Sequence, residues 1–220
     1  MVLCALIFIF TYKFYFIMKQ KILFFLFLIP FTLTAQNTPI ELIKNAGLVN
    51  SNIICHFNQQ RHIVALDKVE ILEGVLYYSG NDRMSMHYTN PPTDLLIING
   101  DQFYMASGKR KKNFNLTQNA TMRSLAHLLL NSMHGDVEAI ATETDAKIEY
   151  TSDAQYHIFT LTKTKREIKG YQRVVLKYAK TDLLLHYMLL EEHSGNYNTY
   201  TLTNHTLQTP SSDKYLIPQK

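Results

Sequence analysis

Short strand-like segments follow one another through most of the chain, and they limit its fold more than any other feature. They cover residues 52–59, 69–79, 83–89, 94–99 and 102–106, and then 147–151, 156–162, 171–178, 182–191 and 196–203. Residues with turn chemistry separate them, such as Asn99-Gly100-Asp101, where Asn and Gly tolerate the positive φ of a tight turn. This regular spacing predicts one large antiparallel sheet, curled or closed, in a mainly β (α+β) fold.

Two segments show signals of helix instead. Thr38 is a candidate N-cap for a short helix that follows it. The longer segment, 119–134, carries an apolar stripe and is followed by Gly135, a typical residue just beyond a helix C-terminus. The stripe consists of Met122, Leu125, Ala126, Leu129 and Met133. Because Leu128 and Leu130 lie off this stripe, the helix needs a broader apolar partner than a single contact line.

Several of the predicted strands are apolar on both faces. Residues 95–98 are four consecutive aliphatic residues, and 72–78 and 183–190 place large apolar side chains on both sides. A one-sided antiparallel sheet would instead present a polar face to water. A packed two-layer core would bury the additional apolar face, and so would a barrel that encloses an apolar cavity. Only the second arrangement predicts a ligand, and the pattern alone leaves both open.

The first 35 residues have the composition of a leader. A basic n-region precedes an apolar run at 22–31, and Ala35 is a small residue at a cleavage position, which together are typical of a secretory signal peptide. We expect translation to start at Met18, residues 1–35 to be removed, and 36–220 to form a single domain. An uncleaved membrane anchor is the alternative, since the apolar stretches together approach the ~20 residues needed to span a bilayer.

Charge and motif content argue against several classes of protein. Of 22 basic and 18 acidic residues, three lysines lie in the leader, so the mature domain is nearly neutral and has no charge signature of a nucleic-acid partner. Cys55, the cysteine outside the leader, is expected to be a small buried hydrophobe. We find no G-x-S-x-G, H-E-x-x-H, phosphate-binding glycine loop or C-x-x-C pattern, and the nine histidines lack compact metal-site spacing. We therefore predict no enzyme, no catalytic residue, no metal and no cofactor.

An ordered series of short motifs runs from residue 57 to residue 104. It opens with Phe57-Asn58-Gln59, and Gly74 begins a short strand. A hydrophobic strand then ends at Pro91, and an apolar strand runs into the turn residue Gly100. In order and spacing these motifs resemble the LolA family of periplasmic outer-membrane lipoprotein carriers. Together with the leader, the N-terminal helix and the long strands of the second half, the likeness extends over most of the mature domain.

The resemblance implies a half-open β-barrel, formed by the curled antiparallel sheet, with a helical lid over its concave mouth. Met84, Met86 and Tyr88 share one strand face, which in the family points toward a cavity for acyl chains, and flexible methionine suits chains of varied shape. The ligand-binding residues implied in this way are Phe57, Leu76, Met84, Met86, Tyr88, Leu96, Ile98, Met122, Leu125 and Leu129. The arginine that tethers the lid in proteobacterial members falls at Gly80 here, so the tether is left open.

The function implied by the resemblance is that of a monomeric periplasmic carrier, or chaperone, which shuttles lipoproteins from the inner to the outer membrane. Its partners would be the acyl chains of the lipoprotein, an inner-membrane release complex and an outer-membrane acceptor. The cargo would be held by burial of apolar surface, which contributes about 0.8 kcal/mol per CH₂ group. The alternative is the same scaffold carrying another lipid or a polyene, or sensing envelope lipid as an interaction domain. The cargo that co-purifies with the protein would distinguish the two.

We expect the secreted protein to begin close to Gln36, because the basic n-region, the apolar run and Ala35 together form a cleavage signal. N-terminal sequencing of the protein from a periplasmic fraction measures this directly. A chain that still begins at Met1 or Met18 would contradict the prediction of secretion and cleavage.

Overall fold

The structure is a computed structural model that describes residues 38–80, 82–165, 170–207 and 215–216. The predicted leader lies outside the described residues. The elements, in chain order, are α2 (Pro39–Val49), β1 (Asn52–Ile63), the 3₁₀ helix η1 (Val64–Leu66), β2 (Lys68–Ser79), β3 (Arg83–Asn90), β4 (Leu95–Asn99), β5 (Gln102–Ser107), β6 (Arg110–Asn115), α3 (Ala120–His134), α4 (Val137–Thr144), β7 (Ala146–Ser152), β8 (Tyr156–Lys163), β9 (Tyr171–Ala179), β10 (Leu185–Glu192) and β11 (Tyr197–Thr206). Within these residues, none of the helices is long and apolar enough to cross a bilayer.

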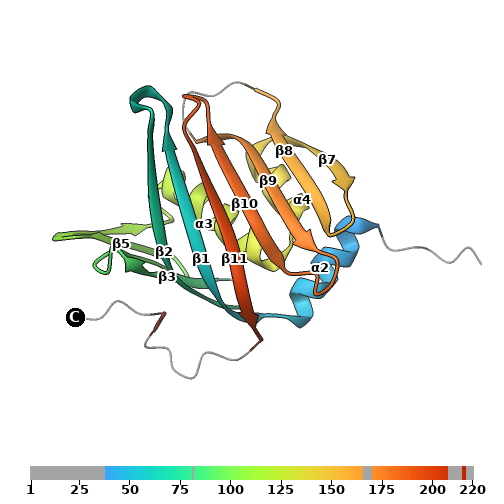
Figure 1. The fold of residues 1–220 in the computed structure, drawn as a ribbon, viewed down its shortest axis with the longest axis horizontal. Coiled ribbons are helices and arrows are strands. Elements are labelled where there is room, and N and C mark those ends of the chain that lie inside the picture. Colours follow the sequence, from blue (N-terminus) through green and yellow to red (C-terminus); the bar gives the residue numbers. More distant parts are fainter. Residues whose placement is uncertain (1–37, 81, 166–169, 208–214, 217–220) are drawn as a thin grey trace, which may run out of the picture. The chain divides into compact units, whose positions relative to one another are not determined.

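The strands form one antiparallel sheet in the order β6-β5-β4-β3-β2-β1-β11-β10-β9-β8-β7 (Figure 1). The sheet consists of two meanders, β1 to β6 and β7 to β11, which are joined where β1 pairs with β11. Strands β6 and β7 lie at opposite edges, so the sheet is open. The predicted curled antiparallel sheet, forming a half-open barrel with a helical lid, is confirmed.

The helices α3 and α4 connect the two edges of the sheet by crossing one of its faces (Figure 1). On that face the strand register places Leu76, Met86 and Leu96 side by side across β2, β3 and β4. These three residues belong to the same buried cluster as Leu129 and Met133 of α3. The core of the protein therefore lies between the helical layer and the covered face of the sheet.

Helix α2 begins at the predicted cap and ends against α3. The Glu41 backbone N–H donates to Thr38 Oγ1 at 3.3 Å, and the Thr38 backbone N–H donates to Glu41 Oε2 at 2.8 Å, which together form a capping box. Near the other end of the helix, a Cβ on Gly47 would lie 1.6 Å from the carbonyl oxygen of His134. The backbones of α2 and α3 thus approach so closely that only glycine fits between them.

Helix α4 and strand β6 are absent from the sequence prediction, as is the short 3₁₀ helix η1. Helix α4 was not predicted, because its eight residues are too short to show helical periodicity over several turns. Its local signal is an N-cap, Asp136, whose side chain accepts a hydrogen bond from the Ala139 backbone N–H at 3.1 Å. Strand β6 was also missed, because it opens with the exposed basic run Arg110-Lys111-Lys112. Exposed charge of this kind is common on edge strands, where it opposes pairing with other chains.

The second apolar face of β2 and β3 is covered in part by the chain itself. Tyr215 stacks on Tyr77 with ring centroids 4.5 Å apart, and His87 Nε2 lies 2.8 Å from the Tyr215 carbonyl oxygen. Leu216 is buried, with 1% of its surface exposed. Part of the two-sided apolar pattern is therefore explained by packing within the chain.

The motif residues Phe57, Gln59 and Gly74 meet Tyr88 in a single cluster. Gly74 lies between Phe57 and Tyr88 in the sheet register, and the two rings meet edge to face with centroids 5.0 Å apart. The Tyr88 hydroxyl donates to Gln59 Oε1 at 3.0 Å, and burial raises the pKa of Tyr88 to about 12. A Cβ on Gly74 would lie 2.7 Å from the Phe57 ring and 2.1 Å from the His87 carbonyl oxygen. The spacing of the motif thus places a glycine where the Phe57 and Tyr88 rings need room to meet.

We expect Gly74→Ala to destabilise the fold by about 3 kcal/mol or more, the upper end of what overpacking costs, because one close contact of the new Cβ is with backbone. Ile71→Ala, at an exposed position of the same strand, is the matched control and should cost about 1 kcal/mol or less. Urea unfolding followed by circular dichroism measures both. Equal midpoints for the two variants would contradict the packing role of Gly74.

Candidate functional site

A cavity of about 400 Å³ lies between the N-terminal half of α3 and strands β7 to β9. The helical side is lined by Ala120, Thr121, Met122, Ser124, Leu125 and Leu128, and the other side by Thr144, Ala146, Leu161, Lys163, Gly170, Tyr171, Gln172, Val174 and Glu192. Most of the accessible lining is apolar. The volume is within the range of about 300–1,000 Å³ that is typical of sites for small ligands.

The cavity exists because α3 is buried unevenly along its length. In the second half, Leu128, Leu129, Leu130 and Met133 are all buried, as the wide apolar surface in the sequence predicted. In the first half, Met122 and Leu125 are only half-buried, although they lie on the same predicted stripe. The cavity lies under this first half.

Tyrosines from the sheet anchor the C-terminal half of α3. The Tyr178 hydroxyl donates to the Ser132 carbonyl oxygen at 2.8 Å, and the Tyr78 hydroxyl lies 3.3 Å from His134 Nδ1. Burial raises the pKa of both tyrosines and lowers the pKa of His134, so the hydroxyls stay protonated and the imidazole stays neutral near pH 7. The Tyr78 hydroxyl and the neutral imidazole share a hydrogen bond whose direction depends on the tautomer of His134. One end of the helix is therefore fixed by hydrogen bonds and close packing.

A small set of polar groups interrupts the apolar lining of the cavity. The Gln172 side-chain nitrogen donates to the Lys163 carbonyl oxygen at 3.3 Å, while Gln172 Oε1 is buried and has no hydrogen-bond partner among the described residues. Burial, and secondarily the charge of Glu192, raises the pKa of Tyr171 to about 12, so its hydroxyl stays protonated at physiological pH. A buried acceptor without a partner is rare and calls for a donor.

The structure distributes the predicted cavity residues over three places. Those lining the 400 Å³ cavity are Met122 and Leu125. Those bordering a second void, of about 10 Å³, are Leu76, Met84, Met86 and Leu129. Those in the surrounding core are Phe57, Leu96 and Ile98, which are buried, and Tyr88, which is packed against them. The assignment of these ten residues to a ligand site stays a prediction, and only two of them lie at the larger opening.

Sequence reasoning missed the sheet side of the cavity. The resemblance was carried by motifs in residues 57–104, whereas the cavity borders strands from the second half of the chain. Leu161 and Val174 are register partners on β8 and β9, and both line it. The available signal was the alternation of apolar residues in these strands, which is the same for a packed face and for a cavity wall. Cys55 is buried and free, as predicted, and burial raises its pKa to about 12.

A comparison with protein-family models identifies the family of this chain. The family model described as "Outer membrane lipoprotein carrier protein LolA" matches residues 51–217. The chain belongs to the LolA family. The resemblance carried by the motifs is therefore confirmed, and the fold indicates a carrier-like role in binding lipid or lipoprotein. None of the curated proteins matches the chain.

Solved structures resemble this one at low sequence identity. An uncharacterised conserved protein from Thermus thermophilus is 9% identical, with 83% of this chain and 96% of that chain covered and a TM-score of 0.51. MucB is 9% identical, with 85% and 64% covered and a TM-score of 0.50. The LolA superfamily protein NE2245 from Nitrosomonas europaea is 12% identical, with 82% and 98% covered and a TM-score of 0.42. At these identities the likeness concerns the fold alone.

The uneven anchoring of α3 predicts a gradient of backbone protection along the helix. We expect the amides of residues 122–126 to exchange faster than those of 130–134, because opening the first half breaks fewer buried contacts. Hydrogen exchange resolved by residue measures the difference. Uniform protection as strong as that of β10 would mean that the whole helix is fixed to the sheet.

Proposed function

We propose that this LolA-family protein is a periplasmic carrier that binds the acyl chains of lipoproteins and moves them from the inner to the outer membrane. The observation that carries the proposal is the apolar cavity of about 400 Å³ beneath the N-terminal half of α3. By family relation, it would receive its cargo from an inner-membrane release complex and pass it to an outer-membrane acceptor.

The lining of the cavity suits a hydrocarbon chain. Met122, Leu125 and Leu128 face Leu161 and Val174 across it. Each CH₂ group transferred from water into such surroundings contributes about 0.8 kcal/mol without requiring a fixed orientation. A carrier of this kind binds chains of varied structure, because apolar burial is not directional.

The polar end of the cavity suits the group to which an acyl chain is attached. Gln172 Oε1 has no partner among the described residues and is held in place through the bond from its amide nitrogen to the Lys163 carbonyl. Because this oxygen is buried, a ligand N–H or O–H donor beside a hydrocarbon chain would satisfy it after the Gln172 side chain turns toward the cavity. The amide at the acylated N-terminus of a lipoprotein is such a donor.

The helical cover allows entry without unfolding the sheet. The C-terminal half of α3 is held by Tyr78 and Tyr178, whereas the N-terminal half is only partly buried. The first half would move outward while the second half acts as a hinge. The neighbouring void is bordered by Met84, Met86, Met133 and Met188. Flexible methionine side chains can rearrange to admit a chain longer than the cavity itself.

We expect Ser124→Phe to weaken binding of a fluorescent fatty acid by tenfold or more, because the new ring would occupy the cavity that Ser124 lines. Displacing as few as two CH₂ groups of the ligand removes about 1.6 kcal/mol, which is more than tenfold in affinity. Arg123→Phe is the matched control: it adds the same ring at the neighbouring, exposed position of α3 and should leave binding unchanged. Titration of the probe, with thermal unfolding of both variants, makes the measurement.

Equal affinities for Ser124→Phe and Arg123→Phe would show that the cavity is not the binding site. Mass spectrometry of protein isolated from its native envelope then identifies the cargo. Lipoprotein supports the shuttle, whereas a free lipid or polyene as the sole cargo would favour the alternative use of the same scaffold.

A further inference from the structure

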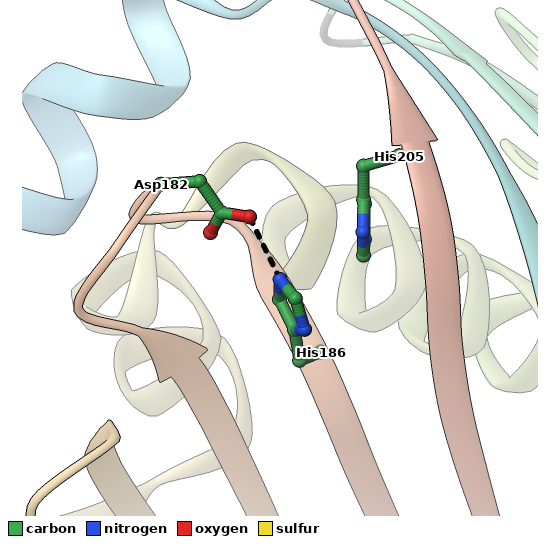
Figure 2. A group of neighbouring side chains, drawn as sticks. All are labelled: Asp182, His186 and His205. Carbon is green, nitrogen blue, oxygen red and sulfur yellow. Dashed lines mark hydrogen bonds and ion pairs between the residues drawn. The ribbon is translucent and has the colours of Figure 1, made fainter.

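Asp182, His186 and His205 lie together away from the cavity, where the β9–β10 turn, the start of β10 and the end of β11 meet (Figure 2). One donor atom of each residue lies within 4.8 Å of the donor atoms of the other two. The Asp182 Oδ2 atom is 2.9 Å from His186 Nε2, and the rings of His186 and His205 stack with centroids 4.5 Å apart. Two imidazoles and a carboxylate therefore converge on one point of the surface.

A β-bulge places His186 in this position. Leu185 is paired with Tyr178 of β9 and Tyr187 is paired with Lys177, so His186 is an additional residue between two consecutive pairs. Bulges of this kind turn a side chain out of the regular alternation of a strand. Just before the strand, Leu183 has a positive φ of 60°, which bends the chain so that Asp182 lies next to His186.

A second irregularity, on the adjacent strand, places His205. Between its pairs with Ile54 and His56, β11 contains two residues, Asn204 and His205, where β1 contains only Cys55. Asn204 has a positive φ of 55°, which is uncommon outside glycine. Departures from regular backbone geometry in two neighbouring strands thus bring their histidines to the same place. Such departures concentrate at functional sites.

Hydrogen bonds from outside the group orient two of its members. His205 Nε2 lies 3.0 Å from the Leu185 carbonyl oxygen, and because a carbonyl can only accept, this nitrogen carries the hydrogen. In the neutral ring, Nδ1 then keeps its lone pair for a ligand. The Asp182 Oδ1 atom accepts a hydrogen bond from the Leu184 backbone N–H at 2.9 Å, which leaves Oδ2 facing His186. Bonds of this kind to the far side of a ligand group are the usual outer shell of a metal site.

We propose that Asp182, His186 and His205 bind a late first-row divalent cation, with Zn²⁺ as the best fit. Imidazole and carboxylate are ligands of Zn²⁺, at about 2.0–2.2 Å, and three protein ligands with a water molecule complete a tetrahedral site. The donor atoms of such a site are about 3.3 Å apart, close to the 2.9 Å between Asp182 and His186. The side chains of these two residues are 37% and 26% exposed, so water has access. Small adjustments of the three side chains would bring their donor atoms, which lie within 4.8 Å of one another, to this spacing, with His205 as the third ligand.

The ion site lies on the sheet and shares no residue with the cavity, so it is independent of the carrier function. A bound ion would join the β9–β10 turn, β10 and β11 at a point where the backbone departs from regular pairing. Because the three ligands converge only in the folded chain, the ion stabilises the fold in proportion to its concentration relative to the dissociation constant.

The experiment uses the mature protein without a histidine tag. Titration calorimetry with Zn²⁺ should give one ion per wild-type chain, and Co²⁺ should give the visible absorption of a tetrahedral site. His186→Ala and His205→Ala should abolish both signals and also the rise in thermal midpoint on adding Zn²⁺. His62→Ala is the matched control, because His62 stacks on Tyr197 at the other end of the β1–β11 pairing. It should bind like the wild type.

Asp182→Asn keeps an oxygen for the Leu184 N–H, so it tests the ligand role even if a histidine variant fails to fold. It should weaken binding of Zn²⁺ while its midpoint without metal stays near that of the wild type. A wild-type chain that binds no Zn²⁺ would overturn the proposal. So would unchanged binding in His186→Ala or Asp182→Asn, which would place the ion at other histidines.

Discussion

Strand β1 pairs with β2 on one side and with β11 on the other, so that the first and last strands of the fold occupy the middle of the sheet. This pairing makes β6 and β7 the two edges, although they are consecutive strands in the chain. The connection between them has to cross the whole apolar face of the sheet. An irregular loop there would leave backbone groups without partners, whereas α3 and α4 satisfy them internally. The helical cover is a consequence of the strand order.

The same connection determines where a cavity can form. One end of helix α3 is packed firmly and closes the core. The other end is packed less closely and leaves space for a cavity. Gly47, Tyr78 and Tyr178 hold its last turns. Toward its first turn the helix is less deeply buried, and the space remains open over β8 and β9. A tightly packed core and an apolar cavity, two alternatives that the sequence left open, thus coexist under one helix.

The pattern of apolar and polar residues predicted most of the strands and helices, but it did not predict the position of the cavity. The alternation in strands such as 69–79 and the stripe of 119–134 each reflect a single local period, and the structure contains both elements nearly as predicted. Helix α4 is too short for its period to stand out. The position of the cavity depends on how α3 lies relative to the sheet, which no local pattern records. Leu161 at the cavity wall and Met86 in the packed core are both ordinary inward-facing residues of strands.

The strand pattern also failed to predict that Asp182, His186 and His205 lie close together. Residues 182–191 have the pattern of a continuous strand, in which Asp182 and His186 would be about 13 Å apart. Leu183 has a positive φ and β10 begins only at Leu185, so the side chains of Asp182 and His186 instead meet at 2.9 Å. His205, on the next strand, joins them only through strand pairing and a bulge. Histidines that look scattered along the chain are brought together by local exceptions to regular structure. The alternating pattern that predicts strands therefore does not show where irregular backbone brings polar side chains together into a candidate site.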